Sequence, residues 1–339
     1  MAAFDKPLTI LSVDPTDADE LLEIGMRHNN NENMLLVVPL IPEGNKEVYK
    51  FCDRSNYDKH KSYEKAYKVA FWLAKAFPDT IIYVDQEIVD ERNPISQEIY
   101  YHLSDDLPDI DIANTPKNLS MCLNELKMFI NIHSTITTNV GRPATGFVYL
   151  MNKLGFTDKV TGPIYVQGGS VWGNDSGTTN LPNLFNRTPR ESMNLARNPT
   201  AFMELVKQVK GNIVVVPTAY TTLQPLACVT STINSVYNSK EQWVNMPYMM
   251  EHEFVKARDI LNQCCKKYYS QDRFSKGAKL FDVDLYNISV SNEDWKRVGN
   301  YVTMKCAIKK GLGEMELHKG ELNGNKDYEH FPEVTVIIR

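Results

Sequence analysis

Three aspartates follow the first apolar run of the chain: Asp14, Asp17 and Asp19. Residues 8–13 have the length and composition of a short strand, and apolar residues at helical spacing begin at Leu21. The aspartates therefore belong to a strand-to-helix turn, which in an open α/β sheet lies at the carboxyl edge, where ligands bind. Helix capping by Thr16 or Asp17, completed by Asp19 or Glu20, would explain some of these residues. Capping does not require Asp14, which makes Asp14 the first candidate for chemistry.

The elements that position this turn follow the pattern of an α/β protein. Residues 34–40 form a continuous apolar run, which is typical of a strand buried on both faces. Residues 63–77 carry apolar side chains at helical spacing, and residues 80–84 are another short β-rich run. This alternation predicts the α/β class, with an open, mostly parallel central sheet flanked by helices.

Further elements are expected along the rest of the chain. Residues 129–133 alternate apolar and polar side chains, as a strand does. Residues 85–116 are acidic and dotted with proline, as in a surface excursion with short helical pieces, and residues 175–190 read as a long polar loop. The apolar spacing predicts helices over residues 145–154, 199–209, 221–236 and 247–269, and strands over residues 163–166, 212–216, 301–308 and 334–338.

Length and charge bound the class of protein. The chain has 339 residues and no composition break that would mark a linker, so one domain over residues 1–339 is expected. Its formal charge of −5 argues against nucleic acid as a partner, because such proteins gather Lys and Arg on one face. The sequence has no secretory segment and no apolar run of membrane-spanning length. We therefore expect a soluble cytoplasmic protein with no membrane partner.

Cysteine and histidine usage gives no metal or disulfide signature. The six cysteines are scattered without Cys-x-x-Cys spacing, which predicts reduced, mostly buried thiols. None of the seven histidines has a partner at metal-ligand spacing, so surface or structural roles are expected for them. Neither Gly-x-Ser-x-Gly nor Gly-x-x-x-x-Gly-Lys occurs, so the sequence predicts neither a serine hydrolase nor a phosphate-binding loop.

The opening turn resembles a motif of the calcium-dependent nucleoside hydrolases. That family begins with a strand followed by Asp-x-Asp-Pro-Gly-x-Asp-Asp, and the matching stretch here is Ser12-Val13-Asp14-Pro15-Thr16-Asp17-Ala18-Asp19. Further short matches follow in the family's order: Gly44-Asn45, Gly168-Gly169, Gly173-Asn174, Met193-Asn194 and Asn198-Pro199 with Ala201. The resemblance implies the family's Rossmann-like fold and hydrolysis of the N-glycosidic bond of a ribonucleoside, giving ribose and free base.

The resemblance also implies a Ca²⁺ site. Asp14, Asp19 and Asp282 match the family's metal-binding aspartates, and a main-chain carbonyl near Asn139 or Val140 would complete the protein ligands. Calcium prefers such oxygen ligands and holds a water together with the ribose hydroxyls. Asp14 is in addition the candidate general base that makes this water a better nucleophile.

For the substrate, the resemblance implies a small-molecule nucleoside or its ribose. Asn45, Asn174 and Asn194 match substrate-binding positions, and Asp282 would contact ribose as well as metal. Phe281 stands where purine-preferring members have an aromatic residue that stacks on the base. Two tryptophans are candidates for a second stacking ring, Trp172 and Trp72. A core phenylalanine at the start of a helix is an equally good interpretation of Phe281.

The sequence also departs from the family's pattern. Ala18 replaces the aspartate that grips the ribose, and Ser192 falls where a ribose-binding glutamate is expected, although Glu191 is adjacent. A His-Gly-x-x-Gly-Leu-Gly loop is missing before Asn139. Two hypotheses therefore stand: an active nucleoside hydrolase, and a catalytically degenerate relative that keeps the fold for binding, structure or self-assembly. The family commonly forms dimers or tetramers, so a homo-oligomer is expected under either hypothesis.

Overall fold

The computed structural model describes most of the chain, with gaps. The described residues are 6–14, 17–42, 52–53, 58–93, 103–168, 170–172, 195, 197–209, 213–218, 220–238, 248–291, 301–309, 315–318 and 328–337. All statements on structure below concern these residues.

A four-stranded parallel sheet forms the N-terminal half of the fold. Its order is β4 (Ile81–Tyr83), β2 (Asn33–Val37), β1 (Leu8–Ser12) and β6 (Ile136–Thr137). Ile10 of β1 lies opposite Leu35 of β2, and every strand pair in this sheet is parallel. The carboxyl ends of these strands therefore share one edge, as expected for the turn that contains Asp14.

A second sheet of seven strands is mostly parallel and adds an antiparallel unit near the C-terminus. Its order is β7 (Asn139–Val140), β8 (Ile164–Gln167), β10 (Ile213–Val216), β13 (Tyr328–Ile337), β11 (Tyr301–Lys309), β12 (Met315–His318) and β9 (Ser170–Trp172). Among the strands that the structure describes in this sheet, β11 alone runs antiparallel to its neighbours. Only Thr138 separates β6 from β7, so the two sheets meet there. A separate antiparallel pair joins β3 (Cys52–Asp53) to β5 (Arg92–Asn93).

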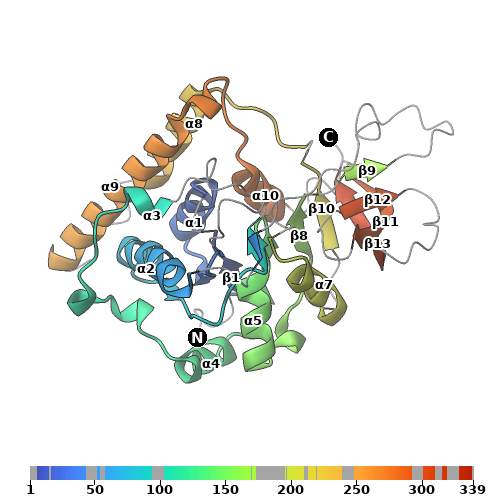
Figure 1. Cartoon of the computed structure of the whole chain (residues 1–339), viewed down its shortest axis with the longest axis horizontal. Coiled ribbons are helices and arrows are strands. Elements are labelled where there is room, and N and C mark those ends of the chain that lie inside the picture. Colours follow the sequence, from blue (N-terminus) through green and yellow to red (C-terminus); the bar gives the residue numbers. More distant parts are fainter. Residues whose placement is uncertain are drawn as a thin grey trace.

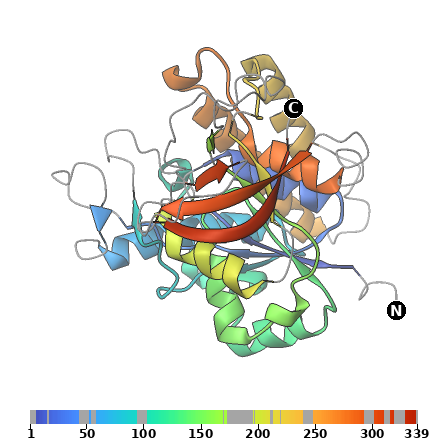
Figure 2. The same cartoon turned by 90° about the vertical axis from the view of Figure 1, so that its right-hand side faces the viewer.

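Helices cover both faces of the sheets (Figure 1). One apolar cluster joins the first sheet to α1 (Asp19–Asn29), α2 (Lys59–Ala76), α8 (Leu226–Tyr237) and α9 (Tyr248–Tyr269). A second cluster joins the opposite face to α4 (Leu123–Asn131), α5 (Thr145–Leu154) and α7 (Pro199–Gln208), and it continues beneath β11 and β13. Figure 2 shows these two long strands, in red, running side by side across the molecule. The short helix α3 (Leu103–Asp106) and α10 (Phe281–Val290) complete the described helices of four or more residues.

The strand β2 is buried on both faces, as its continuous apolar run predicts. Met34 and Leu36 belong to the first cluster, whereas Leu35 and Val37 belong to the second. Successive side chains of a strand point to opposite faces, so a strand covered by helices on both sides must be apolar at every position. The predicted α/β class with a mostly parallel central sheet flanked by helices is confirmed.

Several predicted elements are present, but the strand expected at residues 129–133 is wrong. Those residues fall in α4 and the turn after it, because Leu126 and Ile130 are buried on one side of a helix. Glu125 supports the start of that helix by accepting a hydrogen bond from the Cys122 main-chain N–H at 2.8 Å. A five-residue alternation was too short to distinguish the two periods. The predicted loop at residues 175–190 lies outside the described residues.

Side-chain burial separates the cysteines into two groups. Cys264, Cys265 and Cys306 are buried, as predicted, whereas Cys122 and Cys228 are exposed, and these five are free thiols. Membrane-spanning length and apolarity are found in none of the helices that the structure describes.

Candidate functional site

Two helix N-termini converge at the carboxyl end of β1. The main-chain N–H of Val13 donates to the carbonyl of Val37 at 2.7 Å, so Asp14 is the first residue beyond this contact with β2. Helix α1 begins at Asp19, and α10 packs against α1 and begins at Phe281. The main-chain N–H of Asp282 donates to Asp19 Oδ2 at 2.8 Å. The positive ends of both helices therefore face the carboxylates that gather here.

Six carboxylates form what we call the acidic cluster: Asp14, Asp17, Asp19, Glu20, Glu23 and Asp282. Five of them are buried and Asp17 is partly buried. They come from the β1–α1 turn, the first turns of α1 and the first turn of α10, which lie about 260 residues apart in the chain (Asp19 and Asp282, |i−j| 263). Sequence motifs alone predicted that Asp14, Asp19 and Asp282 lie together, and the fold brings them together.

Burial makes the charged forms of these acids costly. It raises the pKa of Asp282 to about 8, with further increases from nearby Glu23, Asp17 and Asp14, although Arg142 opposes the shift. The pKa of Asp19 is raised well above its usual value by burial, then by the charges of Asp282 and Asp17. Without a cation, burial therefore favours the protonated forms of Asp19 and Asp282.

Three buried arginines among the described residues pair with the acidic cluster: Arg142, Arg197 and Arg27. Arg142 Nε lies 2.8 Å from Glu20 Oε1, and its Nη2 contacts Glu23 and lies 3.5 Å from Asp282 Oδ1. Arg197 pairs through Nη1 with Asp14 Oδ2. These two side chains are only 1% and 4% exposed, so the guanidinium groups are held by the acids rather than by solvent.

Among the described residues, the acids of the cluster still outnumber the arginines that pair with them. Besides Arg142 and Arg197, Glu23 pairs with Arg27 at 2.9 Å, but Arg27 is shared with Glu32 at 2.6 Å. Three buried carboxylate oxygens of the cluster, Asp19 Oδ1, Glu20 Oε1 and Asp282 Oδ1, accept no hydrogen bond from any described residue, and of these Glu20 Oε1 has Arg142 as a close ion-pair partner. Buried polar atoms of this kind require a partner, which here could be a proton or a cation.

The segment expected to supply a main-chain ligand also reaches the cluster. Val140 is buried at the end of β7, where it pairs with Val166 of β8. The next residue, Gly141, lies so close to Asp282 that an added Cβ would overlap its Oδ1 and lie 2.9 Å from its Cγ. Only glycine allows the main chain to approach the carboxylate this closely. Asn139 points elsewhere, toward Ser289 and Arg27.

The predicted substrate residues are only partly placed. Asn45, Asn174 and Asn194 lie outside the described residues, as do Glu191 and Ser192. Phe281 is half-buried at the start of α10, with Lys279 Nζ 5.8 Å from its ring centroid. Trp72 is a core residue of α2, stacked edge-on against Phe71, and its Nε1–H donates to the Pro108 carbonyl at 3.0 Å. These contacts give Trp72 a structural role; the side chain of Trp172 is not described.

The helix-capping alternative explains one aspartate of the turn. Asp17 Oδ1 accepts a hydrogen bond from the Asp19 main-chain N–H at 3.2 Å, and Ala18 is the N-cap residue of α1. Glu20 does not complete a capping box, because its carboxylate accepts from the Asp14 main-chain N–H. The metal-type arrangement is also incomplete: no three His, Cys, Asp or Glu side chains of the described residues are arranged to hold a metal ion.

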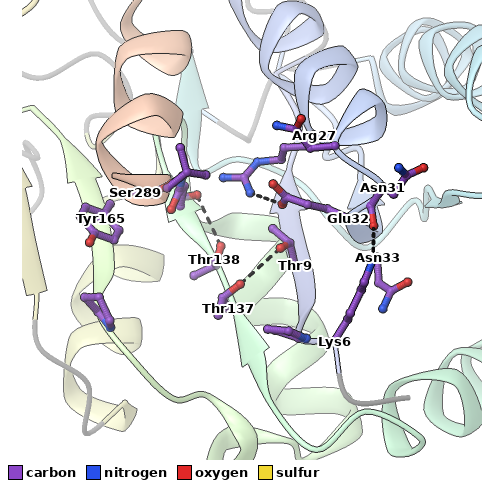
Figure 3. A pocket seen from close by; sticks show the side chains of 15 residues that line it. Lys6, Thr9, Arg27, Asn31, Glu32, Asn33, Thr137, Thr138, Tyr165 and Ser289 are labelled. Carbon is purple, nitrogen blue, oxygen red and sulfur yellow. Dashed lines mark hydrogen bonds and ion pairs between the residues drawn. The ribbon is translucent and has the colours of Figure 1, made fainter. Parts of the chain in front are cut away.

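A hollow lies near the beginnings of β1 and β2, away from the acidic cluster (Figure 3). Its volume is about 420 Å³, and its walls include Lys6, Thr9, Arg27 and Glu32. The polar groups on these walls largely bind one another: Arg27 pairs with Glu32, and Lys6 Nζ donates to the Asn31 carbonyl at 3.3 Å. No carboxylate of the acidic cluster lines this hollow, but Asn139, one of the two candidates for a main-chain ligand, does.

Sequence motifs did not identify Arg142 and Arg197 as site residues. Arg142 stands in a Gly-Arg-Pro turn and Arg197 precedes the helix start at Asn198-Pro199, where a basic residue has no recognisable spacing to the acids. Only the fold brings Arg197 to Asp14, 183 residues earlier in the chain. Comparison with known protein families finds no family model that matches this chain, and comparison with curated proteins finds no similar protein.

Proposed function

We propose that this chain is a divergent nucleoside hydrolase-like enzyme that splits the N-glycosidic bond of purine ribonucleosides. The observation that carries the proposal is the convergence of Asp14, Asp19 and Asp282, which the resemblance assigns to one metal and ribose site. These residues come from opposite ends of the chain, so helix capping within the first turn does not account for their meeting. The order of the short motifs along the sequence supports the same function.

The residues of the acidic cluster fit Ca²⁺ in their chemistry. The donors are carboxylate oxygens, which a hard cation prefers, and Asp19 Oδ1 and Asp282 Oδ1 lack hydrogen-bond partners among the described residues. Among the described residues the buried acids outnumber the arginines that pair with them, and a divalent cation would replace the protons that burial favours on Asp19 and Asp282. Asp14, Asp19, Asp282 and the Val140 carbonyl would hold the ion. When bound, Ca²⁺ would hold a water and the ribose hydroxyls and make that water more acidic.

The chain's own residues would then divide the work. Asp14 would accept a proton from the water, and Asp282 would position the ribose. Phe281, half-buried at the start of α10, would stack on a purine base. Asn45, Asn174 and Asn194 would contact the ribose from segments outside the described residues. A general base of this kind contributes roughly 10²–10⁴-fold to a rate.

Release of ribose from inosine or uridine in the presence of calcium tests this function. We expect purified protein to release reducing sugar, and Asp14→Asn to lower kcat at least about 100-fold, because the amide cannot accept the proton. Asp109→Asn is the matched control, since Asp109 is fully exposed and pairs only with Lys68 at 3.2 Å among the described residues. The proposal is wrong if the unmodified protein releases no more sugar than Asp14→Asn.

A second candidate is a catalytically degenerate protein that keeps the fold for binding, structure or self-assembly. The Arg197–Asp14 pair favours it, because the guanidinium occupies a carboxylate oxygen that would otherwise be open to a water or a metal ion. Ala18, fully buried at the start of α1, cannot grip a ribose. A protein of this second kind would release no sugar, and a ribose-like inhibitor would not raise its melting temperature in calcium.

The proposal extends to location and assembly. Nucleosides are small metabolites, and we propose a cytoplasmic protein that acts on them as a homo-oligomer, with neither nucleic acid nor membrane as a partner. The formal charge of −5 supports the exclusion of nucleic acid.

A further inference from the structure

Arg197 is a buried cation that pairs with Asp14, the general base of the proposed function. Its Nη1 pairs with Asp14 Oδ2, and the two side chains are only 4% and 7% exposed. The guanidinium stays charged at every accessible pH, so it cannot leave this pairing by losing its proton. In the structure described here, Asp14 is therefore already neutralised by a group of the protein.

The position of Arg197 is fixed by the start of α7. Asn198 caps this helix by accepting a hydrogen bond from the Ala201 main-chain N–H at 3.0 Å, and Pro199 begins it. Asn198 Nδ2 also donates to Thr145 Oγ1 of α5 at 3.0 Å. Because the neighbouring residue is anchored on two sides, Arg197 approaches Asp14 from a rigid support.

Arg142 does not have the same relation to the predicted metal ligands. Its close partners are Glu20 and Glu23 of α1, which are not in that ligand set, and its contact with Asp282 is longer, at 3.5 Å. Arg142 could keep both glutamates while a cation occupied the cluster. Arg197 pairs with Asp14, which is itself a predicted metal ligand, so it would have to share or release that carboxylate.

We propose that Arg197 is a built-in competitor for the cation at Asp14. Arg197 neutralises Asp14 in the cation-free protein. Ca²⁺ must displace Arg197 from Asp14 in order to bind, and the free-energy cost of this displacement lowers the affinity for Ca²⁺. This inference rests on the cation site of the proposed function, and it does not depend on nucleoside hydrolysis. Arg197 thus sets the calcium concentration at which the site fills.

Calorimetric titration of the whole chain with CaCl₂ tests the inference. We expect Arg197→Gln to bind Ca²⁺ at least about 10-fold more tightly than the unmodified protein, because the competing charge is gone. Without calcium, the same variant should melt at a lower temperature, since Asp14 loses its buried partner. Arg197→Lys keeps the charge but not the planar fork, and it should show an intermediate affinity.

Two further variants serve as controls, one for the loss of a positive charge and one for a failure of Arg197→Gln to fold. Lys153→Gln also removes one positive charge, but from an exposed pair with Glu87, and it should bind calcium like the unmodified protein. If Arg197→Gln does not fold without calcium, the double variant Asp14→Asn, Arg197→Gln removes both charges. It should fold and should bind calcium no more tightly than the unmodified protein, because the competitor and its ligand are lost together.

The outcomes separate this inference from the proposed function. Tight binding by Arg197→Gln with no binding by the unmodified protein would support the competitor and contradict a calcium-dependent enzyme. Equal affinities, or no binding by either protein, would overturn the inference. If the unmodified protein hydrolyses inosine and both proteins bind calcium with equal affinity, the proposed function is supported and the proposal that Arg197 competes with the cation is wrong.

Discussion

Among single residues, Gly141 is the one that allows the main chain to approach Asp282 closely. The Asp282 carboxylate occupies the space that a side chain at this position would need, and Leu285 Cδ2 would lie 3.3 Å from an added Cβ. Arg142, Glu20 and Asp19 are buried around the same point. A carboxylate enclosed in this way has little room to move aside.

We therefore expect Gly141→Ala to displace the Asp282 carboxylate. Overpacking should cost up to about 3 kcal/mol of unfolding free energy, and calcium affinity should fall because a proposed ligand has moved. Denaturant unfolding and calcium titration measure the two effects. Gly155→Ala is the control: its Cβ meets nothing within 4 Å, and with φ of 70° it carries only a backbone cost of about 1 kcal/mol. Unchanged calcium affinity in Gly141→Ala would contradict this role.

Among the secondary-structure elements, the starts of helices account for several residues that the sequence motifs single out. Asn198 caps α7 and also binds Thr145 of α5, whose hydroxyl donates to Asp90 Oδ1 at 2.6 Å. All three side chains are buried, so this chain of hydrogen bonds joins α7, α5 and the segment after β4. The Asn-Pro pair therefore has a structural role that sequence similarity alone does not reveal.

Replacing Asn198 by alanine should destabilise the protein by about 2 kcal/mol. The change leaves the Ala201 N–H without its cap and removes the amide donor to the buried Thr145 hydroxyl. Asn198→Ser should restore roughly half of this loss, because a serine hydroxyl caps a helix but does not reach as far. Urea unfolding of the three proteins measures the differences. Equal stability of the alanine and serine variants would argue against the capping role.

Packing across the whole molecule brings residues of three helices together around His28. The His28 ring of α1 lies 5.1 Å from Phe77, which follows α2, and 6.2 Å from Phe254 of α9. Arg258 of α9 faces the same two phenylalanines, with its guanidinium 5.6 Å and 5.3 Å from their centroids. Burial, and then the nearby Arg258, lowers the pKa of His28 to about 4.

This pKa predicts how the unfolding free energy depends on pH. The unfolded chain binds a proton at His28 near its ordinary pKa of about 6.5, whereas the folded protein binds it only near 4. The stability that His28 contributes is therefore present above about pH 6.5 and is lost as the pH falls toward 4, at up to about 1.4 kcal/mol per pH unit. His28→Gln should lose less stability over this range in denaturant unfolding. Parallel curves for both proteins would contradict the prediction.

Local sequence determined the fold class and three of the carboxylates. The continuous apolar run at residues 34–40 predicted a strand buried on both faces, because only such a strand has no polar face. Asp14, Asp19 and Asp282 could be selected by the order of the motifs. The strand-to-helix turn after β1 fixes the local positions of Asp14 and Asp19, and the start of α10 fixes that of Asp282. A short alternation of apolar and polar residues predicted secondary structure less well. Residues 129–133 lie in α4 and the turn after it, because burial of Leu126 and Ile130 on one side of a helix outweighed the local pattern.

Tertiary structure alone decided which charges share the buried site. Arg142 and Arg197 carry no local signal, since the partners of a buried arginine are chosen by contacts across the fold. Whether Asp282 keeps its proton at neutral pH depends on burial and on neighbours from α1 that its own segment does not contain. The sequence determined which residues could form a cation site, and long-range packing placed two guanidinium groups beside them.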